Sequence, residues 1–185
     1  MTAEMKVFST GIDPEDWIPP RFTAAGEGKT PSIFWLHLPE RTQSLILLME
    51  HREAEPEKKV FWLVYDIPPQ IEGIAEGGPL PEGAKLGRNS FGEKGYHGPE
   101  ASPDHHLQHY DFLLFATDLK TLGLPEGASW AEIKKVLRGS HPPMDLAPPP
   151  ATDVRARELH PLAHVLEHAE FSGRYALDGD TPARA

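Results

Sequence analysis

The segment from His105 to His109 holds the side chains that most directly suggest chemistry. Histidines stand at positions 105, 106 and 109, and imidazole is the commonest metal ligand in proteins. A metal held there could activate water, so a metal-assisted hydrolase is one hypothesis. His105 and His109 would converge only on a helix, whereas Pro103 and Asp104 favour a loop. With no HExxH motif and no clear carboxylate partner, a solvated loop is the better interpretation.

A second set of histidines lies in the stretch from Asp153 to Glu170, which the sequence predicts to be a helix. His160, His164 and His168 are spaced four residues apart, which would place them on one helical face. At 1.5 Å per residue the set would span about 12 Å, too far for one shared ion. We therefore expect these histidines to pack or to be solvated.

Acidic residues near position 50 could also do chemistry. Glu50 with Glu53 or Glu55 could form a carboxylate pair for general acid–base catalysis. The segment 51–59 is charged throughout, which favours a solvated face instead. We expect a non-enzymatic protein with no catalytic residues, no bound metal and no cofactor.

The turn at Gly95–Pro99 is a more promising binding element. Glycine allows positive φ and proline fixes φ, so the backbone must turn there. The turn would deliver polar groups to the mouth of an apolar strand at Tyr110–Phe115, a common way to build a ligand site. Tyr96, Gly98 and Pro99 could form the rim of a pocket. The alternative is a tight turn whose glycine is needed only for its φ.

The elements that must position these residues are predicted to be mainly strands, because short apolar runs alternate with turn signals. The run from Ser44 to Glu50 is almost continuously apolar, as in a strand buried on both faces. Ser129 and Glu132 form a capping box for a helix that ends at Gly139. The glycine-rich segment 69–94 is loop-like. Strands are predicted over residues 5–9, 32–38, 44–50, 60–68, 110–115 and 171–177.

These elements predict a mainly β fold, a two-sheet antiparallel β-sandwich with two peripheral helices towards the C-terminus. At 185 residues we expect one domain over 1–177, with a Pro-rich insertion at about 139–160 and a disordered tail at 178–185.

Composition excludes several classes of function. There is no cysteine, so disulfides, thiol nucleophiles and thiolate metal sites are ruled out. A formal net charge of −10 disfavours nucleic acid and anionic membrane surfaces. No run of 18 apolar residues occurs, so no membrane span is predicted. We expect a soluble cytoplasmic protein.

The order of motifs resembles the phosphatidylethanolamine-binding protein family, in its bacterial Raf-kinase-inhibitor-like branch. The most specific elements are a Gly-Tyr-x-Gly-Pro turn and a Trp-x-x-x-x-Ile-Pro strand, and the similarity covers roughly residues 5–177. The motifs are Ile18-Pro19-Pro20, Leu45 to Glu50, Phe61 to Pro68, Gly95 to Pro99, His109 to Phe112 and His164-Val165-Leu166.

The resemblance implies a β-sandwich with a small anion pocket, built from an Asp-Pro-Asp-x-Pro segment, a His-Trp pair, a Gly-x-Gly-Pro turn and a His-Arg-Tyr triplet. Here Glu50 stands for the first aspartate, and His51 and Arg52 for the Pro-Asp pair. Phe61 and Gln108 stand where the family has histidines, and His109 takes the place of the arginine. The residues implied to line the pocket are Glu50, Arg52, Phe61, Trp62, Tyr96, Gly98, Pro99, Gln108, His109 and Tyr110.

A phosphate-sized anion needs cationic or N–H donors, and these replacements remove two histidines. The expected function is therefore non-enzymatic binding of a small ligand or phosphoryl group through a degenerate pocket, with phosphoryl affinity weak or absent. The alternatives are an interaction module that inhibits a kinase or protease through its surface loops, and the metal-assisted hydrolase. A protein partner and a homodimer both stay open.

Overall fold

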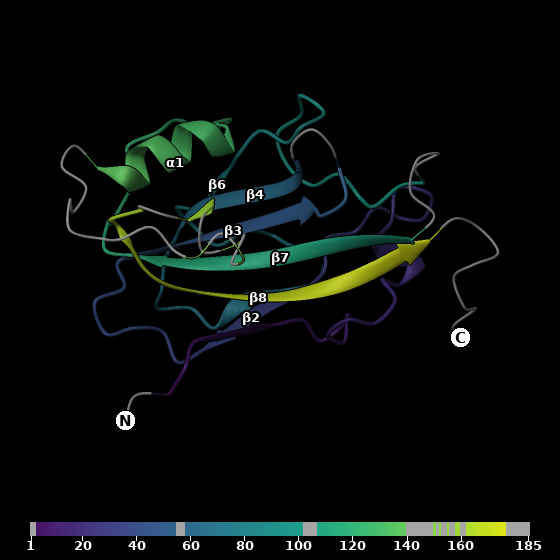
Figure 1. Ribbon diagram of the computed structural model, residues 1–185, viewed down its shortest axis with the longest axis horizontal. Helices are drawn as coiled ribbons and strands as arrows, with labels where there is room; N and C mark the ends of the chain where they lie inside the picture. Colours follow the sequence, from purple (N-terminus) through teal and green to yellow (C-terminus); the bar gives the residue numbers. More distant parts are fainter. Residues whose placement is uncertain are drawn as a thin grey trace.

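The computed structural model describes residues 3–54, 58–101, 107–139, 150, 152, 155, 158–159 and 162–176. Within them two antiparallel sheets stack face to face (Figure 1). One sheet has the strand order β1-β2-β5 and the other the order β6-β4-β3-β7-β8. This confirms the predicted two-sheet β-sandwich. The strands are β1 Lys6–Phe8, β2 Ile33–Leu36, β3 Ser44–His51, β4 Lys59–Ile67, β5 Gly73–Ile74, β6 Lys85–Leu86, β7 Leu107–Thr117 and β8 Val165–Ala176.

Strand β3 is buried on both faces, as its continuous apolar run predicts. Leu45, Leu47 and Met49 belong to the core between the two sheets, which we call the inner face of the five-stranded sheet. Ile46 and Leu48 belong to a second core on the opposite side, the outer face, which α1 (Trp130–Arg138) covers. The alternation of strand side chains therefore assigns each residue of β3 to one of two layers.

A β-bulge in β4 changes this alternation at one point. Met49 pairs with Trp62 and the next residue, Glu50, pairs with Val60, so Phe61 is an extra residue on its strand. A bulge lets two consecutive side chains face the same way. Phe61 and Trp62 accordingly both belong to the inner core.

Helix α1 begins and ends where its sequence signals predict. The Ser129 hydroxyl accepts a hydrogen bond from the Glu132 backbone N–H at 3.2 Å, which satisfies one of the unpaired donors of the first turn. Ile133 and Leu137 are buried against the outer face. Gly139, with φ of +73°, follows the last helical residue, a conformation that glycine adopts without a steric penalty.

The predicted helix over 153–170 is wrong from Val165 onward. Val165–Ala176 is strand β8, which pairs with β7 along the length of both strands. His164 and His168 therefore do not share a helical face: His164 Nδ1 lies 2.8 Å from Asp118, and His168 is a residue of β8. His160, most of the Pro-rich insertion and the predicted tail at 178–185 lie outside the described residues.

The segment 69–94 is not all loop. Gly73–Ile74 pairs with β2, and Lys85–Leu86 pairs with β4. Each strand is only two residues long, which is too short to leave a periodic pattern in the sequence.

Candidate functional site

The turn at Gly95–Pro99 lies against the segment that precedes β2. The Tyr96 hydroxyl donates a hydrogen bond to the Phe22 carbonyl at 2.6 Å, and the Ala24 N–H donates to the Pro99 carbonyl at 2.9 Å. A Cβ atom on Gly98 would lie 2.7–2.8 Å from backbone atoms of residues 22–24. Gly98 is therefore required by close backbone approach and not by a positive φ.

Aromatic rings gather beside this turn, with Phe61 at their centre. Its ring centroid lies 4.9 Å from Tyr110, 5.0 Å from Phe91 and 5.7 Å from His97, each in an edge-on arrangement. His51 stacks on Tyr110 at 5.1 Å and lies 6.2 Å from Phe61. The position that the resemblance gives to a histidine is thus filled by an apolar ring within an aromatic cluster.

Gln108 has both ends of its side-chain amide engaged by neighbours. Its Nε2 donates to the Glu100 carbonyl at 3.2 Å, and its Oε1 accepts from the Tyr110 hydroxyl at 3.3 Å. Burial raises the pKa of the Tyr96 and Tyr110 hydroxyls well above the ordinary value, so both stay protonated donors. The Tyr96 hydroxyl, the Tyr110 hydroxyl and the Gln108 amide each donate to a protein acceptor. Fewer N–H and O–H donors are therefore left for an incoming anion.

His97 lies at the edge of the cluster and has acidic partners. It stacks on Phe91 at 3.8 Å between centroids. Its Nε2 lies 3.0 Å from Glu100 and its Nδ1 lies 3.4 Å from Glu93. The backbone N–H of His97 donates to the Phe61 carbonyl at 2.9 Å, which fixes the turn to β4.

The sheet separates the ten residues implied by the resemblance into two groups. Seven lie at the inner site, namely Phe61, Trp62, Tyr96, Gly98, Pro99, Gln108 and Tyr110. Glu50 and Arg52 lie on the outer face, where they line one cleft with Trp130 of α1. His109 alternates with Gln108 and Tyr110 along β7 and so belongs with this outer group. The expectation that Glu50 and Arg52 share a pocket with Tyr96 is corrected accordingly.

Sequence reasoning missed residues that the structure places at the inner site. His51 occupies the inner position next along β3 from Met49 and stacks on Tyr110. Glu53 connects the two faces: its carboxylate accepts from the His109 backbone N–H at 2.8 Å and contacts the His109 ring, and it lies 3.4 Å from His51 Nε2. Once Met49 is known to face inward, counting alternate residues along β3 points to His51 in place of Glu50, but the sequence alone does not show which way Met49 faces.

The outer group is a buried ionic network. Glu50 and Asp111 are cross-strand partners, and their side chains are 6% and 3% exposed. Arg155 Nη1 lies 2.7 Å from Glu50, and Arg155 Nη2 lies 3.4 Å from Asp111. Arg52 donates to Asp111 from both Nε and Nη2, the shortest of these bonds being 2.7 Å.

The two carboxylates of this network differ in pKa. Burial raises the pKa of Glu50, although Arg155 and Lys58 oppose that effect. Burial acts in the same direction on Asp111, but hydrogen bonds from Arg52 and Ser172, with the charges of both arginines, lower its pKa overall. Asp111 is therefore the better stabilised anion.

Within the described part of the chain, no three His, Asp or Glu side chains come together as metal ligands. His105 and His106 lie outside that part. None of the described helices is both long and apolar enough to cross a bilayer.

Comparison with known proteins agrees with the sandwich fold. The family model described as phosphatidylethanolamine-binding protein matches residues 8–142. The UPF0098 protein of Aquifex aeolicus is 38% identical over 140 residues, which cover 74% of this chain and 82% of the relative. That of Methanothermobacter thermautotrophicus is 33% identical over 126 residues, covering 66% and 82%.

Two solved structures share the fold. The phosphatidylethanolamine-binding protein homolog CT736 of Chlamydia trachomatis superposes with a TM-score of 0.74 at 24% identity. YbcL of Escherichia coli superposes with a TM-score of 0.76 at 22% identity. Each comparison covers 95% of this chain and 99% of the other. The protein has the sandwich architecture of this class of binding proteins. It belongs to the phosphatidylethanolamine-binding protein family.

Proposed function

We propose that this protein is a non-enzymatic binding protein that uses the inner site for a small ligand and has little affinity for phosphoryl groups. The observation that carries the proposal is the state of Gln108, which stands where the family has a histidine. One of its two amide N–H donors is held by the Glu100 carbonyl, and its oxygen accepts from Tyr110. The neutral amide cannot supply the positive charge that a protonated histidine would bring to a phosphate.

The lining of the inner site also disfavours a phosphoryl ligand. Phe61 replaces the other family histidine and packs against Tyr110, Phe91 and His97. The acidic side chains of Glu93 and Glu100 flank His97, and they would repel a dianion. An uncharged ligand with a planar apolar surface fits this lining better than a phosphoryl headgroup does.

Isothermal titration with inorganic phosphate and with phosphoethanolamine tests the proposal. The wild-type protein should show no saturable heat with either compound. The variant that carries both Phe61→His and Gln108→His should gain measurable affinity, because each substitution adds a ring N–H donor.

The matched control carries Phe61→Leu and Gln108→Leu, which alter the same positions without adding a donor, and it should not bind phosphate. Micromolar binding of either compound by the wild-type protein would overturn the proposal. Equal binding by the histidine and leucine double variants would do the same, since donors would then be irrelevant.

A further inference from the structure

A cleft of about 480 Å³ opens on the outer face of the five-stranded sheet. It is lined by the side of α1 that carries Trp130 and Lys134 and by residues of β3 and β7, among them Leu48 and Phe115. Its volume is that of a typical small-ligand site. The sheet lies between this cleft and the inner site, so a ligand here would occupy a different place from the one proposed above.

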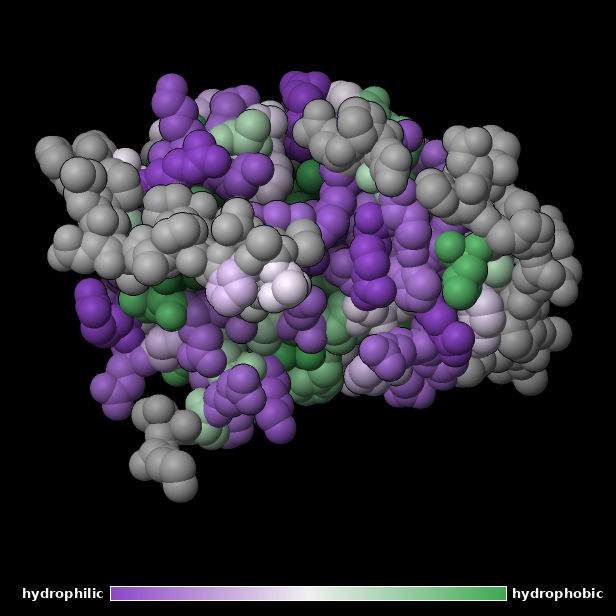
Figure 2. Space-filling view, viewed as in Figure 1, coloured by the Kyte–Doolittle hydropathy of each residue, from purple (hydrophilic) through white to green (hydrophobic). Residues whose placement is uncertain are grey.

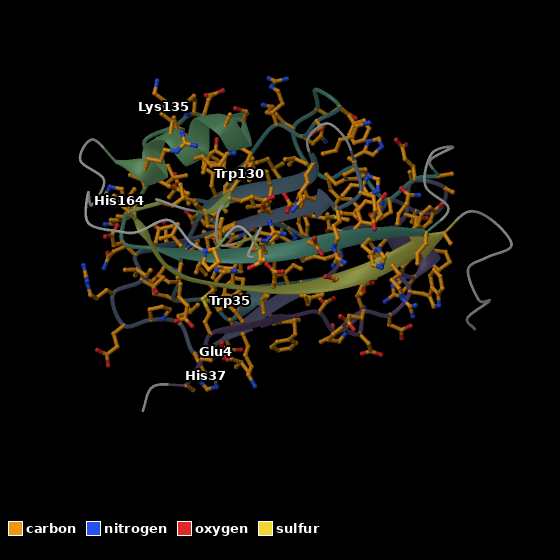
Figure 3. All side chains as sticks on the ribbon, in the orientation of Figure 1. Glu4, Trp35, His37, Trp130, Lys135 and His164 are labelled. Atoms are coloured by element: carbon orange, nitrogen blue, oxygen red, sulfur yellow. The ribbon has the colours of Figure 1, made fainter. Side chains whose placement is uncertain are left out.

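One wall of the cleft is aromatic. Trp130 stacks on Phe115 with ring centroids 5.3 Å apart and an interplanar angle of 28°. Figure 3 shows Trp130 on the side of α1 that faces the sheet, whereas Lys135 points away from it. The indole is only partly buried, so part of its surface is available to pack against a ligand ring.

The acids of the cleft already have partners within the protein. Arg155 lies 2.7 Å from both Glu50 and Glu158. Lys58 lies 3.0 Å from Glu158. The carboxylate of Glu53 is held by His109. The charges of Glu50 and Glu158 are thus balanced by Arg155 and Lys58, so these two acids do not favour a cationic ligand.

Lys134 differs from the other cations of the cleft. It follows Trp130 by one helical turn, and its Nζ lies 5.9 Å from the centre of the Trp130 ring. Within the described part of the chain it has no carboxylate within 4.0 Å, unlike Arg52, Lys58 and Arg155. Figure 2 shows that the face in view is largely hydrophilic, with hydrophobic residues in small separate patches. An ammonium beside an indole, inside a concave site, is suited to an anion with an aromatic body.

We propose that this outer cleft binds a small aromatic carboxylate, with its ring beside Trp130 and its carboxylate on Lys134. The cleft walls exclude part of the solvent, which strengthens the ion pair relative to one on an open surface. For a ligand of about ten heavy atoms we expect a dissociation constant on the order of 1 mM.

The indole N–H signals of the ¹⁵N-labelled full chain test the proposal directly. There are four tryptophans, and Trp62 lies at the inner site while Trp130 lines the outer cleft. Phenylacetate should shift the Trp130 signal in a saturable manner and leave the Trp62 signal in place. Phenylacetamide, which lacks the charge, should bind about tenfold more weakly. The Trp130→Phe variant assigns the signal.

Two lysine variants complete the test. Lys134→Gln should weaken phenylacetate binding about tenfold, because it removes one charge-assisted contact. Lys135→Gln changes the charge of the same helix by the same amount on its exposed side and should bind as the wild type does. No saturable shift of Trp130, equal affinity for phenylacetamide, a shift of Trp62 instead, or unchanged binding by Lys134→Gln would each overturn the proposal.

Discussion

Glu50 on β3 and Asp111 on β7 are direct cross-strand partners, and both carboxylates are buried on the outer face of the sheet. Two like charges so placed are tolerated because Arg155 contacts both and Arg52 adds a two-nitrogen contact to Asp111 alone. The pair is therefore asymmetric. Asp111 has two arginines and a serine hydroxyl, whereas Glu50 depends on Arg155 and on Lys58 at 3.7 Å.

Removing the two charges should have opposite consequences. Asp111→Asn should lower the free energy of unfolding by about 3 kcal/mol at pH 7, because Arg52 loses its buried carboxylate partner and Arg155 loses one of the two that it contacts. This is the low end of the usual range, since the Arg52 side chain is 45% exposed. Glu50→Gln should leave the free energy unchanged or raise it by about 1 kcal/mol or less, because it relieves a desolvated charge. Urea unfolding of the two isosteric variants measures both changes in the free energy of unfolding. Equal losses of stability in the two variants would contradict the asymmetry.

The pH dependence of the same two variants follows from the pKa shifts. The pKa of Asp111 is lowered in the folded protein, so its stabilising effect is present above its unfolded pKa of about 3.9 and is lost as pH falls through the lower folded value. The loss of stability in Asp111→Asn should therefore become smaller at the acid end of the pH range.

The pKa of Glu50 is raised, so ionised Glu50 lowers the free energy of unfolding at neutral pH. Any advantage of Glu50→Gln should disappear as pH falls below about 4.3. Unfolding curves recorded between about pH 3 and pH 8 measure both trends, and a pH-independent difference would refute them.

Gly98 should not accept a side chain. In Gly98→Ala the new Cβ would lie 2.7 Å from the Ala24 nitrogen and 2.8 Å from the Phe22 oxygen, both backbone atoms that cannot rotate away. We expect a loss of about 3 kcal/mol in the free energy of unfolding. Gly83→Ala is the matched control, since nothing lies within 4 Å of its Cβ and only its φ of +92° is unfavourable. It should cost about 1 kcal/mol, and equal costs at both positions would show that space at Gly98 is unimportant.

The N-cap of α1 offers a local test of the wall of the outer cleft. Ser129→Ala removes the acceptor of the Glu132 N–H and should cost about 1 kcal/mol of stability. Ser129→Asp keeps an acceptor and should retain the wild-type melting temperature or exceed it, because a negative charge suits a helix N-terminus. A Ser129→Ala variant as stable as Ser129→Asp would mean that the cap contributes nothing.

Local signals in the sequence were sufficient for β3, β4 and α1. The apolar run of β3 and the Ser129 cap act within a few residues of chain, so no tertiary information is needed to interpret them. Strand β8 is different. Most of its residues are only partly buried, and the four-residue histidine spacing that ends in it at His168 is compatible with a helix. Only pairing along β7 makes the strand preferable.

The sequence predicts residues of the candidate site but not the face of the five-stranded sheet on which each one lies. Because β3 is buried on both sides, its sequence shows no alternation between apolar and polar residues that would tell Glu50 from His51. The bulge at Phe61 adds a second change of face that no local pattern signals. The turn residues Tyr96, Gly98 and Pro99 were easier, since their neighbours in the motif fix their position.

The hydrogen bond from the His164 N–H to the Leu137 carbonyl, at 3.0 Å, brings the end of α1 beside the start of β8. A short linker from Gly139 to Leu162 could therefore replace residues 140–161 with little added loop-closure entropy. Such a shortened chain lacks Arg155, and Glu50 then loses its main counter-charge. A minimal version of the domain therefore requires Glu50→Gln as a companion change.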